Sequence, residues 1–551
     1  MGGIVKRDDL PAAADITIDI DVTTSSSPES SNNNNNNNNE MKLPKAVEVL
    51  VLTFNCAKNA IDVPVFGGHL RGVLLEQDGG GGELPELPEL VVMSLQEIAP
   101  LSYSFLGEWF LGGYYAAFGE ALNFAGRKYT LVKGKNVGMT AVLLFALHPE
   151  RVVGGGGGVV EEGEVGFGAA DMGNKGAVGL RVRYSTGAAA AAAAATSDGQ
   201  QEQATEMTFV ATHLAAMEWN LKKRNANWRS IVSGLTFGNP LGVLPRGVVL
   251  PAKLTRTGVL PDRSGVGERT QPVVVDSSEE EDAPLLSAPS TFSVSDDNNN
   301  NKNEDEETTT TTVLTPEQKR QLQDMSIFKP GSHLFVAGDL NYRISSTTPP
   351  PGSAFPSFDT GSENYYMNFL ARDQLTQERL AGRTFHGMSE AEVTFGPTYK
   401  YDVLEGPEGA ENEMGARQKG EVPWRFAGHR WPAWTDRVLY SAAEGTEVEA
   451  GRYGCLPVVR SSDHRAVFFR ARVPLTGAGG GVKTEAGVEE RKKLPVDIDV
   501  YSWDRRQSAR RRELVVGLLA LVWSTREGAV FLGTVVMVGM GWWWFARGGF
   551  F

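Results

Sequence analysis

Short apolar runs that end in a polar residue recur along the chain. Residues 46–55, 90–97 and 333–337 are dense in branched and other apolar side chains and contain neither Gly nor Pro. Their length and composition predict buried β-strands. The polar residues that end or closely follow these runs are Asn55, Glu97 and Asp339. The pattern therefore predicts strand ends that carry one amide and two carboxylates.

Further elements follow from the same reading of the chain. Residues 129–135 and 138–146 predict a hairpin, 208–216 an apolar strand and 364–379 a helix. A further strand is predicted to open near Ser462.

Low-complexity stretches limit how much of the chain can build a core. The segment 1–40 ends in a run of Asn, and about 244–320 is rich in Pro, Ser, Thr, Asn and acidic residues. Such sequence cannot bury enough apolar surface to offset chain entropy. We therefore predict a disordered tail at 1–40 and one catalytic domain over 41–475 with a disordered insertion at about 244–320. An inserted recognition module is the alternative, and no periodic segment favours it.

Charge and cysteine content narrow the class of protein. The net charge is −14, but acidic residues concentrated at 276–307 account for most of the excess. Cys56 and Cys455 are the two cysteines of the chain, and they lie far apart. Two distant cysteines fit a reducing compartment and offer neither a disulfide framework nor a zinc site.

The string Gly338-Asp339-Leu340-Asn341 places a carboxylate and an amide two residues apart after an apolar strand. Burial at such a strand end can raise the pKa of Asp339, so that it takes a proton from water, and Asn341 can donate to a phosphate oxygen. An Asx turn that closes the strand is the structural alternative.

Asn55 and Glu97 suit a hard cation at the ends of their strands. Magnesium takes oxygen ligands, needs one or two carboxylates and keeps several waters. Without its context, the pair Gln96-Glu97 is more often the start of a helix.

Two loops offer groups for an anionic ligand. Lys175, between glycines in Gly173-Asn174-Lys175-Gly176, provides a point charge for a phosphate, although such a loop by itself is more often a hairpin turn. Tyr399 and Lys400 provide a hydroxyl and an ammonium group, although a turn with a solvated Lys is the simpler explanation.

Together these strings resemble the signatures of the inositol polyphosphate 5-phosphatases, within the endonuclease/exonuclease/phosphatase superfamily. The string from Gly338 to Ile344 resembles the central signature of the family. The partner strings appear in the order of the family, at 53–55, 96–97, 173–178, 212–216, 224–225, 397–402, 432–439 and 462–467. The resemblance covers about 46–473.

The resemblance implies an α/β fold, a deoxyribonuclease-like four-layer sandwich of two mixed β-sheets flanked by helices. It also implies Mg²⁺ bound by Glu97 with help from Asn55, and Asp463 touching the metal site through water. In this reading Asp339 activates the attacking water.

The resemblance assigns roles to the remaining site residues. Those implied to neutralise charge on the phosphoryl group, or to orient a histidine that does so, are Asn341, His213, His464 and Asp436. Asn174 and Lys175 are implied to contact the phosphate end of the substrate. Tyr399, Lys400 and Arg430 are implied to recognise the 4-phosphate of the inositol ring.

The C-terminal segment lies outside the resemblance. We predict a linker with an Arg cluster at 476–513 and a transmembrane helix at 528–546, which is uncharged and ends near three Trp. A buried core helix is the alternative. No signal peptide is predicted, so the pattern is that of a tail anchor with the Arg cluster in the cytosol. The endoplasmic reticulum is the expected membrane, with the mitochondrial outer membrane as the alternative.

The function expected from these observations is a magnesium-dependent hydrolysis of the 5-phosphate of phosphatidylinositol 4,5-bisphosphate. The 3,4,5-trisphosphate lipid and soluble inositol polyphosphates are alternative substrates. The expected partners are the phosphoinositide lipid and the membrane, with no nucleic acid and no obligate protein partner. The rival interpretations are a nuclease or sphingomyelinase of the same superfamily, and a catalytically dead scaffold that binds phosphoinositides.

Overall fold

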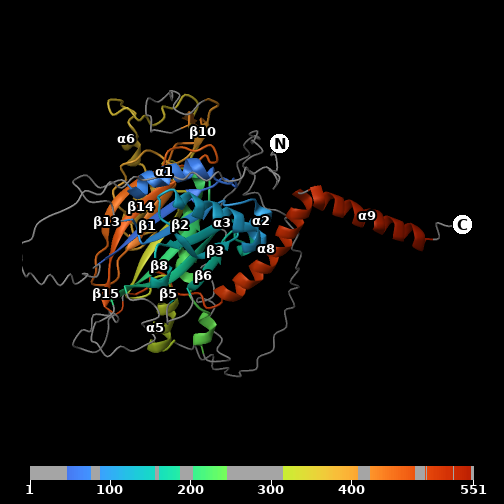
Figure 1. Ribbon diagram of the computed structural model, residues 1–551, viewed down its shortest axis with the longest axis horizontal. Helices are drawn as coiled ribbons and strands as arrows, with labels where there is room; N and C mark the ends of the chain where they lie inside the picture. Colours follow the sequence, from blue (N-terminus) through green and yellow to red (C-terminus); the bar gives the residue numbers. More distant parts are fainter. Residues whose placement is uncertain are drawn as a thin grey trace, which may run out of the picture. The chain divides into compact units, whose positions relative to one another are not determined.

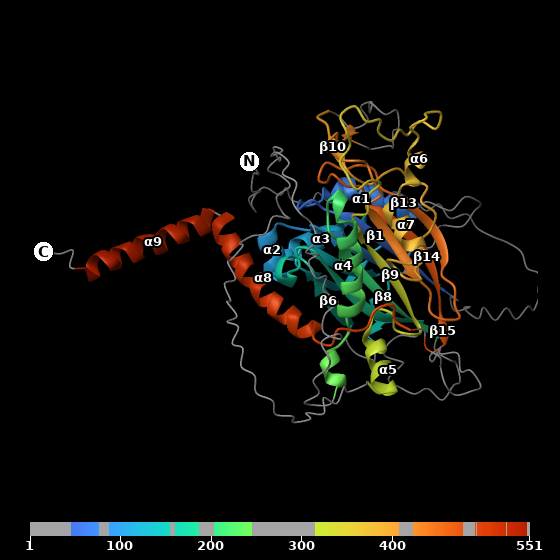
Figure 2. The same ribbon diagram turned by 180° about the vertical axis from the view of Figure 1, so that it is seen from behind.

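The computed structural model describes most of the chain and shows two mixed β-sheets flanked by helices (Figures 1 and 2). The described residues are 46–75, 87–154, 160–186, 203–244, 314–406, 422–477, 491, 493–524 and 526–547. The predicted tail at 1–40 and most of the predicted insertion lie outside these residues.

The first sheet has six strands in the order β13-β14-β1-β2-β4-β3. Its strands are β1 (Ala46–Asn55), β2 (Leu90–Gln96), β3 (Thr130–Val137), β4 (Thr140–Ala146), β13 (Glu449–Cys455) and β14 (Val467–Pro474). β1 and β2 are parallel and the other neighbours antiparallel. The strand predicted at 46–55 is confirmed with the same bounds, and the strand predicted at 90–97 ends one residue earlier.

The second sheet follows the order β12-β9-β8-β7-β5, with β6 on β7 and β15 on β8. Its strands are β5 (Val152–Gly154), β6 (Glu161–Gly166), β7 (Gly176–Ser185), β8 (Gln203–His213), β9 (Ser332–Asp339), β12 (Asp436–Ser441) and β15 (Thr476–Gly477). Only β8 and β9 are parallel among these described strands. A separate ribbon consists of β10 (Tyr401–Val403) and β11 (Trp424–Phe426).

Side chains of the central strands point alternately to the two faces of their sheet, and both faces are covered, which gives a four-layer sandwich. In β1, Val49 and Val51 pack between the sheets with Phe335 of β9, whereas Leu50 and Leu52 pack against helices. Successive side chains of a strand point to opposite faces, so both faces of β1 are buried. Each buried aliphatic side chain of this kind contributes roughly 1.5–3 kcal/mol.

Helices cover the outer face of each sheet. α1 (Val63–Leu75) and α3 (Glu108–Asn123) cover the first sheet and face the viewer in Figure 1. α4 (Leu221–Gly234) covers the second sheet through Trp228 and Ile231 and faces the viewer in Figure 2. The four layers confirm the predicted fold class.

The remaining helices are short or lie late in the chain. They are α2 (Leu101–Leu106), α5 (Pro316–Met325), α6 (Tyr366–Leu370), α7 (Gln374–Leu380), α8 (Ser502–Ser524) and α9 (Arg526–Ala546). Single 3₁₀ turns are η1 (Pro149–Arg151), η2 (Ala169–Asp171), η3 (Glu218–Asn220) and η4 (Pro240–Val243).

Two helix boundaries differ from the prediction. The helix expected at 364–379 is two helices, because Asp373 caps α7 by accepting from the Thr376 N–H at 2.8 Å. The predicted insertion extended to 320, but α5 begins at Pro316 with a capping box between Thr315 and Gln318. Thr-Pro-Glu-Gln is a helix-start sequence that outweighs the polar composition.

The C-terminal segment is helical where a linker was predicted. Residues 502–513 form the first half of α8, and the apolar residues 514–523 continue the same helix. Within the ranges given above, no helix combines the length and apolar character that crossing a bilayer requires. The transmembrane helix predicted at 528–546 is therefore not supported.

Candidate active site

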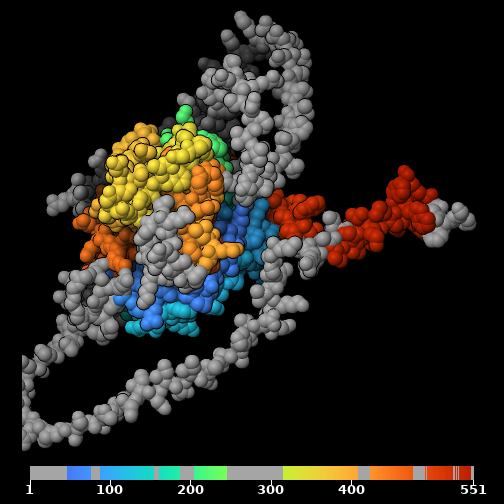
Figure 3. Space-filling view, turned by 90° about the horizontal axis from the view of Figure 1, so that it is seen from above, coloured from blue at the N-terminus to red at the C-terminus, as the bar shows by residue number. Residues whose placement is uncertain are grey.

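The register of the strands brings the polar strand ends together. β1 and β2 are parallel, so Asn55 and the residue before Glu97 end at the same edge of the first sheet. In the second sheet His213 pairs with Asp339, and Asp436 of antiparallel β12 stands opposite Asp339. Figure 3 shows blue, yellow and orange segments, far apart in sequence, meeting on one face of the molecule.

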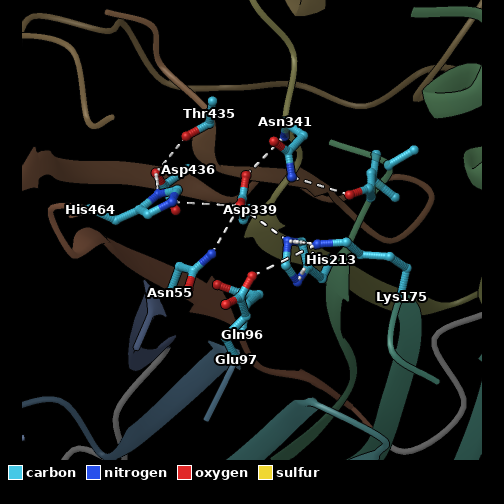
Figure 4. Close-up of polar contacts among 12 residues, drawn as sticks. Asn55, Gln96, Glu97, Lys175, His213, Asp339, Asn341, Thr435, Asp436 and His464 are labelled. Carbon is cyan, nitrogen blue, oxygen red and sulfur yellow. Dashed lines mark hydrogen bonds and ion pairs between the residues drawn. The ribbon is translucent and has the colours of Figure 1, made fainter. Parts of the chain in front are cut away.

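Asp339 lies at the centre of this arrangement (Figure 4). Its Oδ2 accepts a hydrogen bond from Asn55 Nδ2 at 3.1 Å and lies 3.3 Å from His213 Nε2. Its Oδ1 accepts from the Asn341 N–H at 3.0 Å. The Asn341 amide in turn donates to the Leu214 carbonyl at 3.1 Å. Two side chains that are distant in sequence, together with the neighbouring Asn341 backbone, thus fix one buried carboxylate.

Asp436 and His464 form a second buried unit beside Asp339. His464 Nδ1 lies 2.9 Å from Asp436 Oδ2, which also accepts from the hydroxyls of Thr398 and Thr435 at 2.7 and 2.8 Å. The opposite ring nitrogen, Nε2, lies 3.9 Å from Asp339 Oδ2. Because the carboxylate binds Nδ1, it sets the orientation of the ring, as the sequence predicts for Asp436.

The pKa of Asp339 moves in the direction opposite to the prediction. Burial would raise the pKa of Asp339, but the hydrogen bond with His213 and the charge of His464 outweigh burial and hold the pKa well below its ordinary range. The predicted upward shift is wrong because the fold surrounds the strand end with cationic groups. Asp339 is therefore a carboxylate at neutral pH and acts as a hydrogen-bond acceptor.

The pKa of His464 is raised to about 9. Burial alone would lower the pKa of His464, but the charges of Asp436 and Asp339 and the hydrogen bond to Asp436 stabilise the imidazolium. His464 therefore carries a positive charge at neutral pH and can donate to a phosphoryl oxygen.

Glu97 provides a further carboxylate to the cavity. Its backbone has a φ of 46°, a left-handed conformation that costs a residue with a side chain roughly 1–3 kcal/mol and is typical of functional sites. Lys58 and Lys175 lie 3.8 and 3.9 Å from its oxygens. Burial would raise the pKa of Glu97, but Lys175, His213 and Lys58 outweigh it and lower the pKa.

Of Glu97 and Asn55, which were predicted to bind the metal, Glu97 is the one with a suitable ligand group for a divalent cation. A carboxylate that is ionised and faces the cavity is a suitable magnesium ligand. Asn55, its predicted helper, is already engaged: Oδ1 accepts from the Ala57 N–H at 3.0 Å and Nδ2 donates to Asp339. Glu97 is therefore the residue that would hold Mg²⁺, and Asn55 positions Asp339.

Asp339, Asp436 and His464 bring one potential metal-ligand atom each within 4.8 Å of one another. Among the described residues this is the grouping of acidic and histidine side chains that could hold a metal. However, His464 is protonated and bound to Asp436, so the grouping is better described as an oriented histidine beside a carboxylate.

Lys175 and Asn174 differ in position although they are neighbours. Lys175 Nζ lies 2.7 Å from His213 Nε2 and lines the cavity, and its predicted contact with a phosphate stays a prediction. Asn174 does not line this cavity, and its Oδ1 is buried without a hydrogen-bond partner among the described residues. The structure thus gives no support to Asn174 as a substrate contact.

A cavity of about 680 Å³ extends from this centre to the predicted substrate-binding residues. Its walls include eleven of the thirteen predicted site residues: Asn55, Glu97, Lys175, His213, Asp339, Asn341, Tyr399, Lys400, Arg430, Asp463 and His464. The Tyr399 ring lies against the His464 ring, with centroids 4.4 Å apart. Asp463 lies 3.5 Å from Lys400 Nζ, and its predicted contact with the metal site through water stays a prediction.

Several residues of the site were missed in the sequence. Thr398 and Thr435 hold Asp436, Arg343 lies over the Tyr399 ring at 4.5 Å, and Glu218 lies 3.6 Å from Arg430. Thr398, Thr435 and Arg343 stand inside the strings that carried the resemblance, so the strings could have indicated them. Glu218 offered no such signal, because its role depends on an arginine far along the chain.

Comparison with known proteins adds a family and several relatives. The model of endonuclease/exonuclease/phosphatase family 2 matches residues 52–470. The polyphosphatidylinositol phosphatase INP53 of Saccharomyces cerevisiae is 24% identical over 398 residues, which are 71% of this chain and 24% of that protein. The phosphatidylinositol 3,4,5-trisphosphate 5-phosphatase 1 of Mus musculus is 31% identical over 149 residues, 27% of this chain and 12% of that protein.

A third relative is the phosphatidylinositol polyphosphate 5-phosphatase type IV of Rattus norvegicus, 30% identical over 165 residues, 30% of this chain and 23% of that protein. The chain thus spans about a quarter or less of the length of these relatives. A solved 5-phosphatase domain of synaptojanin, in complex with inositol (1,4)-bisphosphate and calcium, has 18% identity and a TM-score of 0.45 over 87% of this chain and 92% of that one.

Proposed function

The chain belongs to the endonuclease/exonuclease/phosphatase family, and from that premise we propose that it is a phosphoinositide 5-phosphatase. The observation that carries the proposal is the buried Asp339 carboxylate, held by Asn55 and His213 in a cavity lined by Lys175, Lys400 and Arg430. A carboxylate acceptor surrounded by cations suits the hydrolysis of a polyanionic phosphate ester.

The proposed substrate carries a second phosphate beside the one that is removed. Lys400 and Arg430 line the same cavity as Asp339 but pair with the separate carboxylates Asp463 and Glu218. The named relatives are phosphatases of phosphoinositides, which supports this class of substrate. We propose phosphatidylinositol 4,5-bisphosphate as the substrate and the 4-phosphate lipid as the product.

In the proposed reaction a water attacks the phosphorus of the 5-phosphate and the ester bond to the inositol oxygen breaks. One proton of the water passes to the inositol oxygen, so that an inositol hydroxyl and inorganic phosphate are released. Asp339 accepts a hydrogen bond from the water and orients it, since its lowered pKa keeps it ionised. His464 holds a proton on Nε2 for a phosphoryl oxygen, because Asp436 occupies Nδ1. Lys175, beside His213, adds positive charge at the same place. Mg²⁺ bound at Glu97 would supply Lewis-acid polarisation of the phosphate.

The test is phosphate release by the full chain on vesicles that contain either the 4,5-bisphosphate or the 4-phosphate lipid. We expect Mg²⁺-dependent release from the first and none from the second. A third arm with soluble inositol 1,4,5-trisphosphate compares lipid and soluble substrates. Equal release from both lipids, or none from any substrate by folded protein, contradicts the proposal. The location at the endoplasmic reticulum membrane stays a prediction.

A further inference from the structure

α8 contacts the catalytic domain although it lies beyond residues 52–470, which the family model matches. Gly517 of α8 packs so closely on α2 that an added Cβ would lie 3.0 Å from the Phe105 side chain. Arg510 donates to the Phe105 carbonyl at 2.6 Å. Figures 1 and 2 both show α8 beside α2. The helix is therefore part of the folded domain.

Glu513 is the fully buried charged residue of α8. Its two oxygens accept from Arg506 Nη1 and Nη2 at 2.6 and 2.7 Å, and Arg506 also donates to Glu164 of β6 at 2.9 Å. Arg510 lies 3.4 Å from Glu513 Oε2. A buried carboxylate with bidentate arginine contact has a fixed position.

The same carboxylate reaches the loop that carries Lys175. Glu513 Oε1 accepts from the Gly173 N–H at 2.8 Å, and the Gly173 carbonyl accepts from the Met139 N–H at 3.1 Å. Gly173 is thus held from both sides. Lys175, two residues later, has its Nζ 2.7 Å from His213 Nε2.

The backbone of this loop is strained. Between β6 and β7 it contains Ala170 and Asp171 with φ of 53° and 62°, conformations that are unfavourable for residues with side chains. Arg512 of α8 donates to the Ala170 carbonyl at 2.7 Å. Two side chains of α8 therefore bind the backbone of a strained loop, one at Ala170 and one at Gly173.

We propose that Glu513 is a positioning residue of the active site. It holds the loop 168–175 so that Lys175 stays in contact with His213. In this way α8 helps to position a side chain of the active site. The kinetic part of this inference rests on the proposed phosphatase function. The structural part does not.

The first experiment is hydrogen exchange on the full chain with Glu513→Gln. The substitution keeps the size of the side chain but removes the charge that Arg506 and Gly173 share. We expect peptides covering 168–175 to exchange roughly tenfold faster, while peptides of β1 keep their rate. The matched control is Arg511→Gln, an exposed residue of the same helix. Unchanged exchange at 168–175 in folded Glu513→Gln overturns the proposal.

The second experiment is a double-mutant cycle with Lys175→Met. Glu513→Gln should lower kcat/KM about tenfold in the wild-type background and less than twofold in the Lys175→Met background, because the effect passes through Lys175. Equal losses in both backgrounds show a general loss of stability and overturn the proposal. A wild-type chain without activity contradicts the proposed function and leaves hydrogen exchange to decide the inference.

Arg512→Ala covers the case in which Glu513→Gln does not fold. Arg512 is exposed and supports the same loop from outside, so its removal leaves the buried ion pairs in place. We expect roughly threefold faster exchange at 168–175. If Glu513→Gln does not fold and Arg512→Ala leaves the exchange unchanged, α8 does not hold the loop and the proposal is wrong.

Discussion

The two ends of the cavity are built differently. At the proposed hydrolytic centre the Asp339, Asp436 and His464 side chains are at most 5% exposed, and Asn55, Thr398 and Thr435 hold them through hydrogen bonds of 2.7–3.1 Å. At the proposed recognition end Lys400 and Arg430 pair with Asp463 and Glu218 at 3.5 and 3.6 Å, and Lys400 is 18% exposed.

The difference indicates what each end can do when a substrate arrives. Short buried hydrogen bonds preorganise the groups that act on the transition state, so no reorganisation is needed during reaction. Longer ion pairs are weaker and can be replaced by a substrate phosphate. Substitutions at the centre should therefore reduce kcat, and substitutions at the recognition end should raise KM.

The largest effect is expected from Asp339→Asn. The change keeps the shape but removes the charge that accepts from Asn55 and interacts with His213, and we expect kcat to fall about a thousandfold. Phosphate release at saturating substrate measures it. Asp504→Asn, on the exposed side of α8, is the control that should leave kcat unchanged. A loss below tenfold contradicts the central place of Asp339.

His464→Gln tests the charged pair at the centre through pH. The pKa of His464 is raised to about 9, so the pair stabilises the fold fully below the ordinary value near 6.5 and loses this contribution as pH rises through about 9. We expect the unfolding free energy of the wild type to fall, relative to His464→Gln, by on the order of 3 kcal/mol between pH 6.5 and 10. Chemical denaturation at several pH values measures this difference.

His333→Gln is the control for that experiment. His333 is also buried, but burial lowers its pKa to about 4, so in the folded protein it is neutral throughout pH 7–10. Its replacement should leave the slope of stability with pH unchanged in this range. Equal slopes for the wild type and His464→Gln would show that the His464 pair is not charged.

Lys400→Met tests the recognition end. We expect KM for phosphatidylinositol 4,5-bisphosphate to rise roughly tenfold with kcat nearly unchanged, because one charge-assisted contact to the substrate is lost. Lys319→Met, exposed on α5, is the control. A fall in kcat with constant KM would place Lys400 with the hydrolytic centre and remove the distinction between the two ends.

Thr398→Val should give the smallest effect. It removes one of the two hydroxyl donors to Asp436 without changing the volume of the side chain, and we expect kcat to fall about threefold. Thr140→Val is a close control, because Thr140 is equally buried and its hydroxyl has no hydrogen-bond partner among the described residues. Equal activity of the two variants would show that Thr398 does not support Asp436.

Local patterns determined much of the architecture. Apolar runs predicted β1, β2 and β9, because a central strand buries its side chains on both faces and is therefore almost entirely apolar. Asn55 and Asp339 could be recognised as site residues because each is a polar residue at the end of such an apolar run. The resemblance identified eleven of the residues that line the cavity, although each of its strings alone had a plain structural alternative.

Tertiary structure decided what depends on groups from distant segments. The pKa of Asp339 falls rather than rises because the fold places His213 and His464 beside it. The place of Asp463 next to Lys400 was set in the same way, by groups brought together across the fold. The sequence predicted a linker at 476–513, because the ion pairs of Arg506 and Arg510 with Glu513 and the contact of Glu513 with Gly173 form only in the folded chain. A sequence pattern predicts where strands and helices form. The charge and burial of a side chain at a site depend on neighbours that only the folded chain brings together.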